Sequence, residues 1–462
     1  MARRGLLIIL MFVLSAIVPA YAKTGVQVLD RKAMMALVDL PSEDFAAARN
    51  VRRASAEAEL APPSTGSERR MVLWQWATGM VDYPYFHWRE TGKSVPDDWA
   101  PKKAAIASVR FDDPSALDVP VYRDFIDAWL HDGAGVLLRS DPKRRQGDNV
   151  WLRARFDMLA LVPDRQIGIT SMSRVLTAHI DDNGARDIGT QIEALAVRGA
   201  PPEAIATFRK AEADEMASLR DYIAVVYKRV NGVDLFLHIS RPEGGAGLHP
   251  VALWLHGGSW ETGHWSYCPV FCTRLKELGF SVVQVEYRTA QRFDTTPLDR
   301  LKDGSDSLNW LKHHGREMGL DTDHLLVAGF SSGASLAVQL AQRPAYGVKG
   351  ALLLSGCYDL TEESWYVRTV SPLADVKALS PVYAVTKATP PLLLFHARDD
   401  KLCSYSAANA LAEKSSAYHD MTRLIDFEEG GHFFVFTSPL IRKRLKEETG
   451  IFVRGLRLNT NP

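Results

Sequence analysis

The strongest constraint on how this chain folds is a short turn at residues 329–333, with the sequence Gly-Phe-Ser-Ser-Gly. An apolar, strand-like run at residues 325–328 leads into it, and an amphipathic, helix-like run at residues 335–342 follows it. Glycines two residues before and two residues after a serine let a strand turn sharply into a helix, which exposes the serine hydroxyl at the edge of a sheet. Only Ser331 has glycine at both positions, so Ser331 is the candidate nucleophile and Ser332 is its neighbour.

A second glycine turn lies upstream, again at the end of an apolar run. Residues 251–255 are typical of a buried strand, and the sequence His-Gly-Gly-Ser-Trp follows at residues 256–260. Backbone N–H groups in such a loop point into a cleft and stabilise a developing oxyanion, where one donor contributes roughly 3–4 kcal/mol. The alternative is an ordinary glycine loop. The turn at Ser331 downstream favours the oxyanion role.

Two adjacent carboxylates are candidates for the acid that orients a catalytic imidazole. The apolar run at residues 391–395 ends in a short segment that contains both Asp399 and Asp400. Asp400, four residues after His396, is the favoured acid. Asp399 is the alternative; otherwise we expect it to cap the turn or to pair with Arg398.

The candidate general base is His432, which follows a Gly-Gly pair in the loop after the last apolar run, residues 423–427. The chain order Ser331, Asp400, His432 is the order expected for an α/β-hydrolase. Other histidines in the same half of the chain are interpreted as structural: His256, His313 and His314.

These motifs together resemble a known family. The segments concerned are residues 256–260, 285–288, the turn around Ser331, residues 355–360 and residues 396–400. As a set they are similar to the α/β-hydrolase esterases of the hormone-sensitive-lipase type, and most of all to the kynurenine-formamidase and feruloyl/acetyl-esterase-like branches. The resemblance runs from about residue 227 to the C-terminus, roughly half of the chain.

The resemblance implies hydrolysis of a carboxylic ester without cofactor or metal. It also implies that the backbone N–H groups of Gly258, Ser259 and Ser332 bind the oxyanion, with Gly257 as the turn residue. Two positions depart from the common family pattern. Ser259 replaces a third glycine but still offers a backbone N–H, and Phe330 replaces an acidic residue before the nucleophile.

The C-terminal half predicts an α/β fold, with a mostly parallel sheet and helices on both faces. A hairpin is expected over residues 223–239, around Asn231-Gly232, a small cap over residues 358–382 and a closing helix over residues 438–452. The expected parallel strands are residues 251–255, 281–287, 325–329, 350–355, 391–395 and 423–427.

At 462 residues the chain is longer than one hydrolase domain requires, so a further domain is expected. The predicted division is residues 1–22 as a signal peptide, 23–66 as a helical arm and linker, 67–221 as a helical N-terminal domain, and 222–462 as the catalytic domain. Six aromatic residues between Trp74 and Trp88 are expected to form a helical core, with a carbohydrate-stacking platform as the alternative.

The N-terminus predicts export. Arg3 and Arg4 precede an apolar run at residues 6–18, and Ala-Tyr-Ala at residues 20–22 forms a cleavage site for a secretory signal peptide. A membrane anchor is the alternative, although the run is shorter than the ~20 residues of a membrane-spanning helix. After cleavage we expect a periplasmic or secreted protein without membrane insertion. Lys+Arg and Asp+Glu both number 55, so no excess charge favours nucleic acid or an anionic membrane.

Export permits disulfides between the four cysteines, Cys268, Cys272, Cys357 and Cys403. Cys357 and Cys403 follow successive strands, so their bridge is the expected one. Cys268 and Cys272 are expected on one helix, in a geometry that keeps the two thiols apart. The alternative for all four is a buried free thiol. The spacing of cysteines and histidines does not favour a zinc site.

These observations favour an exported serine hydrolase that cleaves carboxylic esters through an acyl-enzyme on Ser331. The expected substrate is a small-molecule or oligosaccharide-linked ester, and no cofactor is expected. Within enzymes the alternative is an amide hydrolase, either an exopeptidase of the prolyl-oligopeptidase type or a formamidase. The alternative outside enzymes is an inactive binding protein on the same fold.

Overall fold

The computed structural model describes residues 29–60, 66–243, 247–268 and 270–458. The expected signal peptide, residues 1–22, lies outside the described residues. The chain forms two compact units. The first consists of Met1–Asp181 and Asp187–Ala211, and the second of Asp182–Arg186 and Glu212–Pro462.

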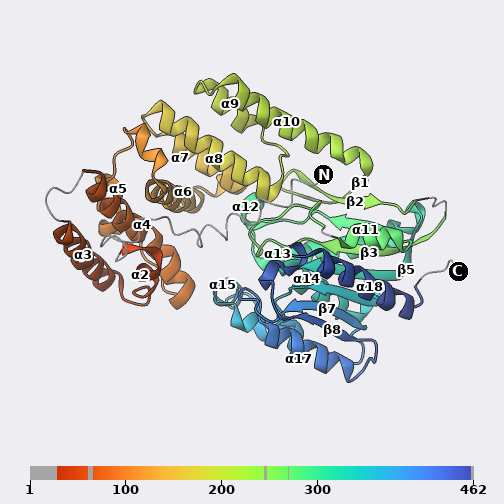
Figure 1. Cartoon of the computed structure of the whole chain (residues 1–462). Coiled ribbons are helices and arrows are strands. Elements are labelled where there is room, and N and C mark those ends of the chain that lie inside the picture. Colours follow the sequence, from red (N-terminus) through yellow and green to blue (C-terminus); the bar gives the residue numbers. More distant parts are fainter. Residues whose placement is uncertain (1–28, 61–65, 244–246, 269, 459–462) are drawn as a thin grey trace. The chain divides into compact units, whose positions relative to one another are not determined.

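The first unit is helical throughout its described part (Figure 1). In α4, Trp74, Trp76 and Tyr83 are buried, which confirms the expected aromatic core for these three positions. The helices are α2 (Arg31–Met35), α3 (Ser42–Glu59), α4 (Gly66–Thr91), α5 (Ala100–Ser108), α6 (Pro120–Ser140), α7 (Val150–Ala160), α8 (Arg165–Asn183) and α9 (Gly189–Val197), and α10 (Pro202–Ser218) continues into the second unit.

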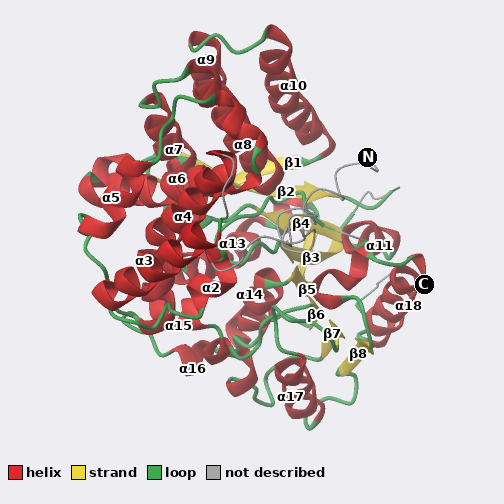
Figure 2. Cartoon of the chain, turned by 60° about the vertical axis from the view of Figure 1, so that its left-hand side comes forward, coloured by secondary structure: helices red, strands yellow, loops and turns green. Residues whose placement is uncertain are grey.

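The described residues of the second unit form a sheet of eight strands in the order β1-β2-β4-β3-β5-β6-β7-β8, drawn in yellow in Figure 2. Strand β2 runs antiparallel to both of its neighbours, and the remaining pairs are parallel. The strands are β1 (Ile223–Val230), β2 (Val233–Ser240), β3 (His249–Leu255), β4 (Ser281–Val285), β5 (Leu320–Phe330), β6 (Gly350–Leu354), β7 (Leu392–Ala397) and β8 (Arg423–Phe427). The predicted hairpin and each predicted parallel strand are therefore present, with ends shifted by a few residues.

Alternating side chains of the central strands supply both faces of the core. In β3, Val251, Leu253 and Leu255 belong to one core cluster with side chains of α13, α14 and α17, whereas Ala252 and Trp254 belong to a second cluster with side chains of α11 and α18. Strands buried on both faces are typical of parallel sheets that are covered by helices. The helices of this unit are α11 (Phe271–Glu277), α12 (Ala290–Phe293), α13 (Pro297–His314), α14 (Ser332–Ala341), α15 (Ser364–Val370), α16 (Val376–Leu379), α17 (Tyr405–Ser416) and α18 (Pro439–Gly455).

A five-residue segment from the end of α8, Asp182–Arg186, belongs to the second unit rather than the first. Its Asp182 carbonyl accepts a hydrogen bond from the Gly263 amide at 3.0 Å. Arg186 forms an ion pair of 2.8 Å with Glu286, which is buried at the end of β4 and also pairs with Arg292. The second unit is therefore built from two separate stretches of the chain.

Two disulfides are present, and one of them corrects the expectation from the sequence. The expected bridge between Cys357 and Cys403 is confirmed. Cys268 and Cys272 are also bridged, with Cα atoms 5.8 Å apart, so the prediction that these thiols stay apart was wrong. The reason is that α11 begins only at Phe271, which leaves Cys268 ahead of the helix, where helical side-chain geometry does not apply.

Within the described part of the chain, no helix combines the length and the apolar character required to cross a membrane.

Candidate active site

Ser331 lies at a strained turn between β5 and α14. Its φ of 54° and ψ of −126° are unusual for a residue with a side chain, and such backbone strain costs about 1–3 kcal/mol. The two flanking glycines make the turn sterically possible. A Cβ on Gly329 would collide with the Gly333 carbonyl, and a Cβ on Gly333 would collide with the carbonyls of Leu255 and His256. Glycine is therefore required at both positions, because β3, β5 and α14 come very close to one another at Ser331.

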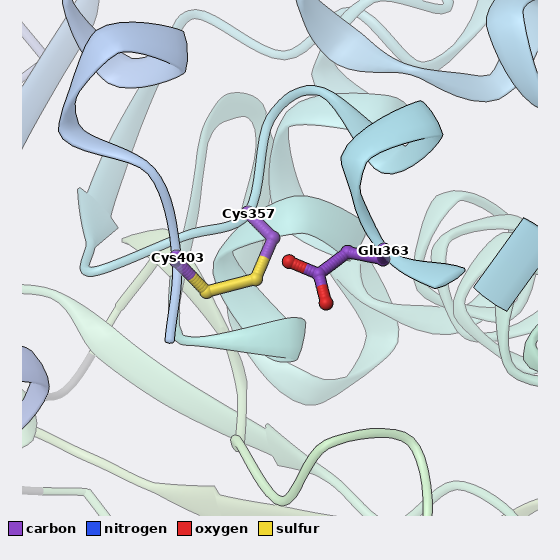
Figure 3. Close-up of side chains that lie close together, drawn as sticks. All are labelled: Cys357, Glu363 and Cys403. Carbon is purple, nitrogen blue, oxygen red and sulfur yellow. A yellow bond between two sulfur atoms is a disulfide. The ribbon is translucent and has the colours of Figure 1, made fainter. Parts of the chain in front are cut away.

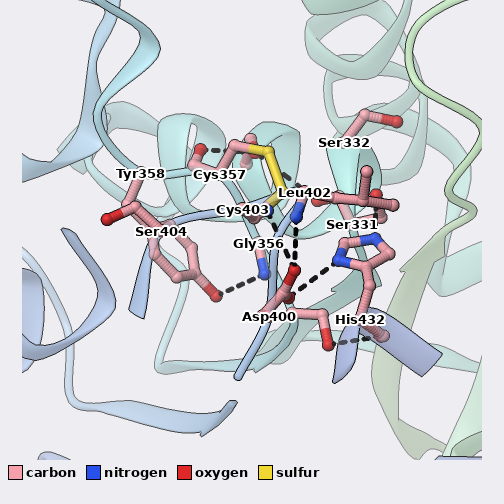
Figure 4. Close-up of a disulfide and its surroundings, with 12 residues drawn as sticks. Ser331, Ser332, Gly356, Cys357, Tyr358, Asp400, Leu402, Cys403, Ser404 and His432 are labelled. Carbon is pink, nitrogen blue, oxygen red and sulfur yellow. Dashed lines mark hydrogen bonds and ion pairs between the residues drawn. A yellow bond between two sulfur atoms is a disulfide. The ribbon is translucent and has the colours of Figure 1, made fainter. Parts of the chain in front are cut away.

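Three predicted side chains form one hydrogen-bonded chain at the carboxyl ends of the strands (Figure 4). His432 Nε2 lies 2.9 Å from Ser331 Oγ, and His432 Nδ1 lies 2.8 Å from Asp400 Oδ2. An ionised carboxylate only accepts hydrogen bonds, so Nδ1 carries the imidazole proton and Nε2 accepts the hydrogen bond from the serine hydroxyl. This is the arrangement in which a histidine removes a proton from a serine as the serine attacks a carbonyl.

The structure distinguishes the two candidate acids. Asp400 is buried and contacts His432, whereas Asp399 is exposed and accepts the amides of Gly430 and Gly431 at 3.3 and 2.7 Å. Asp399 thus caps the turn that leads to His432, and it does not reach the imidazole through any hydrogen bond of the described residues. Arg398 pairs with Asp426 and Glu428 instead.

Hydrogen bonds keep the Asp400 carboxylate ionised. Burial alone would raise the pKa of Asp400, but hydrogen bonds from His396, His432 and the Cys403 amide outweigh that effect and hold the pKa well below its usual range. Oδ1 accepts the amides of Leu402 and Cys403 at 2.8 and 3.0 Å. An acid that stays charged stabilises the imidazolium that forms when the serine loses its proton.

Ser355 is a site residue that the sequence argument missed. It follows β6, is fully buried and has a φ of 44°. Its hydroxyl donates a hydrogen bond of 2.9 Å to the His432 carbonyl, so it fixes the backbone of the base. The sequence offered two signals for it, its place at the end of a strand between Ser331 and Asp400 and its position in the segment 355–360 that resembles the family.

The glycine loop after β3 brings backbone N–H groups to the serine. Gly258, Ser259 and Trp260 all have positive φ, and the Trp260 amide donates to Ser332 Oγ at 3.4 Å. A Cβ on Gly257 would lie 3.2 Å from the Cβ of Ser331, so this residue must be small for the loop to approach Ser331. No hydrogen bond among the described residues uses the N–H of Gly258, Ser259 or Ser332.

His256 supports this loop, and no hydrogen bond among the described residues joins it to Ser331. Its Nδ1 lies 2.7 Å from the Gly257 carbonyl, and its ring stacks on Tyr287 at 4.1 Å. Burial lowers the pKa of His256 to about 3, so the ring is neutral at physiological pH. This agrees with a structural role for His256, as expected.

Aromatic and apolar side chains surround the hydrogen-bonded chain. The Phe330 ring lies 5.4 Å from that of His432 and 5.9 Å from that of Phe433. On another side, Trp260 packs in a cluster with the short helices of residues 358–382, where its ring lies 5.1 Å from that of Tyr366. Low polarity around the serine strengthens each electrostatic contact at the site.

One group of side chains has the spacing of metal ligands, but its chemistry does not fit a metal. The sulfurs of Cys357 and Cys403 and a Glu363 carboxylate oxygen lie within 4.8 Å of one another (Figure 3). The two sulfurs are bonded to each other, and a disulfide does not supply the thiolate ligands that zinc requires. We therefore assign no metal to this group.

Comparison with known proteins points to ester hydrolases. The BD-FAE family model matches residues 237–345. LipM of Mycobacterium tuberculosis, described as a probable carboxylic ester hydrolase, is 28% identical over 218 residues, which is 41% of this chain and 49% of LipM. ICMEL1 of Arabidopsis thaliana, a probable isoprenylcysteine alpha-carbonyl methylesterase, is 23% identical over 250 residues, which is 47% of this chain and 51% of ICMEL1. The chain thus spans about half the length of these curated relatives.

Among solved structures, the propionate-bound esterase 2 of Thermogutta terrifontis is similar, with 22% identity and a TM-score of 0.49. The similarity covers 53% of this chain and 97% of that structure. The second unit has an α/β-hydrolase fold, as its sheet order and its helices on both faces indicate. Its sequence resembles those of carboxylic ester hydrolases.

Proposed function

We propose that this protein is a serine esterase that cleaves carboxylic esters through an acyl-enzyme on Ser331. The observation that carries the proposal is the hydrogen-bonded chain from Asp400 through His432 to the hydroxyl of Ser331. The similarity to LipM and ICMEL1 supports an ester as the substrate class. The expected substrate is a small-molecule or oligosaccharide-linked ester.

The proposed reaction has two halves. His432 Nε2 takes the proton of Ser331 as the oxygen attacks the ester carbonyl, and the backbone N–H groups of Gly258, Ser259 and Ser332 stabilise the oxyanion. The tetrahedral intermediate collapses, and His432 gives its proton to the departing alcohol. Water then attacks the acyl-enzyme with His432 again as the base, and the carboxylic acid leaves as Ser331 recovers its proton.

The substrate class is tested with nitrophenyl esters of increasing acyl length, run beside acetyl-xylan, feruloyl esters and aminoacyl nitroanilides. We expect turnover of esters and little or none of the nitroanilides, measured as kcat/KM. Faster cleavage of the nitroanilides would favour an amide hydrolase instead. Absence of both turnover and covalent labelling by a fluorophosphonate would leave an inactive binding protein on this fold.

We also propose that the protein is exported, with cleavage after Ala22. The two disulfides support this proposal, because disulfides persist in oxidising compartments and are rare in the cytosol. We expect the protein recovered from the periplasm or medium to begin at Lys23, as measured by intact mass and N-terminal sequencing. An uncleaved chain confined to the cytoplasmic fraction would contradict export.

A further inference from the structure

A second histidine contacts the same carboxylate as His432. His396 lies on β7 with a fully buried side chain, and its Nε2 is 3.3 Å from Asp400 Oδ2. The same Nε2 is 2.9 Å from the carbonyl oxygen of Cys403. The oxygen of Asp400 that contacts the candidate base is therefore shared between two imidazoles.

The partners of His396 fix its tautomer. A carbonyl oxygen only accepts hydrogen bonds, so the short contact to Cys403 requires a proton on Nε2. His396 Nδ1 is buried and has no hydrogen-bond partner among the described residues. The ring N–H of His396 is therefore on Nε2, directed at the Cys403 carbonyl and at Asp400.

The Nε2–H of His396 contacts both ends of the turn that contains Asp400 and Cys403. Within the turn, the Cys403 amide donates to Asp400 Oδ1 at 3.0 Å, while the Cys403 carbonyl accepts from His396. Cys403 is also tied to Cys357 by the disulfide, and the Cys357 carbonyl accepts the hydroxyl of Ser335 on α14, the helix that follows Ser331. Both oxygens of the Asp400 carboxylate therefore have hydrogen-bonding partners, and the backbone of Cys403 bonds to the carboxylate and to His396.

We propose that His396 is a positioning residue that acts through Asp400, by holding Oδ2 of the carboxylate in the orientation that His432 requires. The proposal rests on the proposed esterase function. Without the N–H of His396, the Asp400 side chain and the turn at Cys403 lose one common anchor. The imidazole of His432 is then less well oriented toward Ser331, and small misplacements of reacting groups cost up to about 100-fold in rate.

Three substitutions of His396 distinguish a role in positioning Asp400 from a role in packing the core. His396→Gln keeps an N–H donor four bonds from Cα, as in His Nε2, whereas His396→Asn places its donor one bond nearer and His396→Leu has none. We expect His396→Leu and His396→Asn to lower kcat by about 10–100-fold with little change in KM, and His396→Gln to restore most of the loss. Equal kcat for the Gln and Asn variants, or unchanged kcat in a Leu variant with a lowered melting temperature, would overturn the proposal.

A measurement on the unmodified protein covers the case in which the variants do not fold. Chemical shifts of ¹⁵N-labelled histidine report which ring nitrogen carries the proton. We expect a proton on Nε2 of His396, and an Nδ1–H tautomer that leaves Nε2 without a proton would overturn the proposal. Failure of the esterase function itself is recognised separately, because the wild-type protein would then turn over no ester while the tautomer of His396 remained as expected.

Discussion

Replacement of Ser331 by alanine is expected to abolish ester hydrolysis, with a loss in kcat of about 10⁶-fold. The hydroxyl of Ser331 is the only group of the protein that forms a covalent bond to the substrate in the proposed mechanism, and it lies 2.9 Å from His432 Nε2. The variant is also expected to lose covalent labelling by a fluorophosphonate probe. Ester turnover is followed with a nitrophenyl ester, and folding is followed by thermal unfolding.

Ser332→Ala is the matched control, because it removes a hydroxyl from the next residue. Ser332 Oγ accepts the Trp260 amide at 3.4 Å, so a modest loss of rate is expected from a looser glycine loop, but the backbone N–H of residue 332 remains. Labelling should persist in this control. Labelling that survives in Ser331→Ala and disappears in Ser332→Ala would show that the register of the turn is wrong.

The second large effect is expected from Asp400→Asn, with a loss in kcat of about 10⁴-fold. An amide has nearly the shape of the carboxylate but can donate a hydrogen bond to His432 Nδ1, which favours the tautomer that protonates Nε2. A histidine in that tautomer does not accept the proton of Ser331. The measurement is kcat as a function of pH. A loss of similar size at every pH indicates that the general base no longer works, whereas a displaced pH profile indicates that it works in a different pH range.

Asp399→Asn is the control for this prediction. Its carboxylate contacts the amides of Gly430 and Gly431 and no ring nitrogen of His432. An asparagine oxygen still accepts one of these amides, so we expect a loss below about tenfold. A larger loss in Asp399→Asn than in Asp400→Asn would identify Asp399 as the acid.

The predicted site residues followed from short motifs at the ends of apolar runs, namely the glycines around Ser331 and the Gly-Gly pair before His432. In the structure, parallel strands bring their carboxyl ends to one edge of the sheet, so residues that follow β5, β7 and β8 lie close together. The turn at Ser331 was also determined in register, because only glycine tolerates the close approach at positions 329 and 333.

The features that sequence reasoning left open or got wrong depend on loop conformation. Asp399 and Asp400 are adjacent, and only the course of the turn decides which carboxylate faces the imidazole. Cys268 and Cys272 were expected on one helix, but the helix starts after Cys268. His396 and Ser355 lie at strand ends like many unremarkable residues, and their contacts with the site appear only once the neighbouring loops are placed.

The segment Asp182–Arg186 limits where the chain can be divided into separate domains. Five residues encoded within the helical region are structurally part of the hydrolase fold, where they accept the Gly263 amide and place a cation beside Glu286. Gly263 itself packs on His256 and Gly257, at the base of the glycine loop. The second unit transplanted as one contiguous stretch from Glu212 onward would leave that amide without its acceptor and the buried Glu286 with one fewer cation. Any boundary drawn around the second unit therefore has to include Asp182–Arg186.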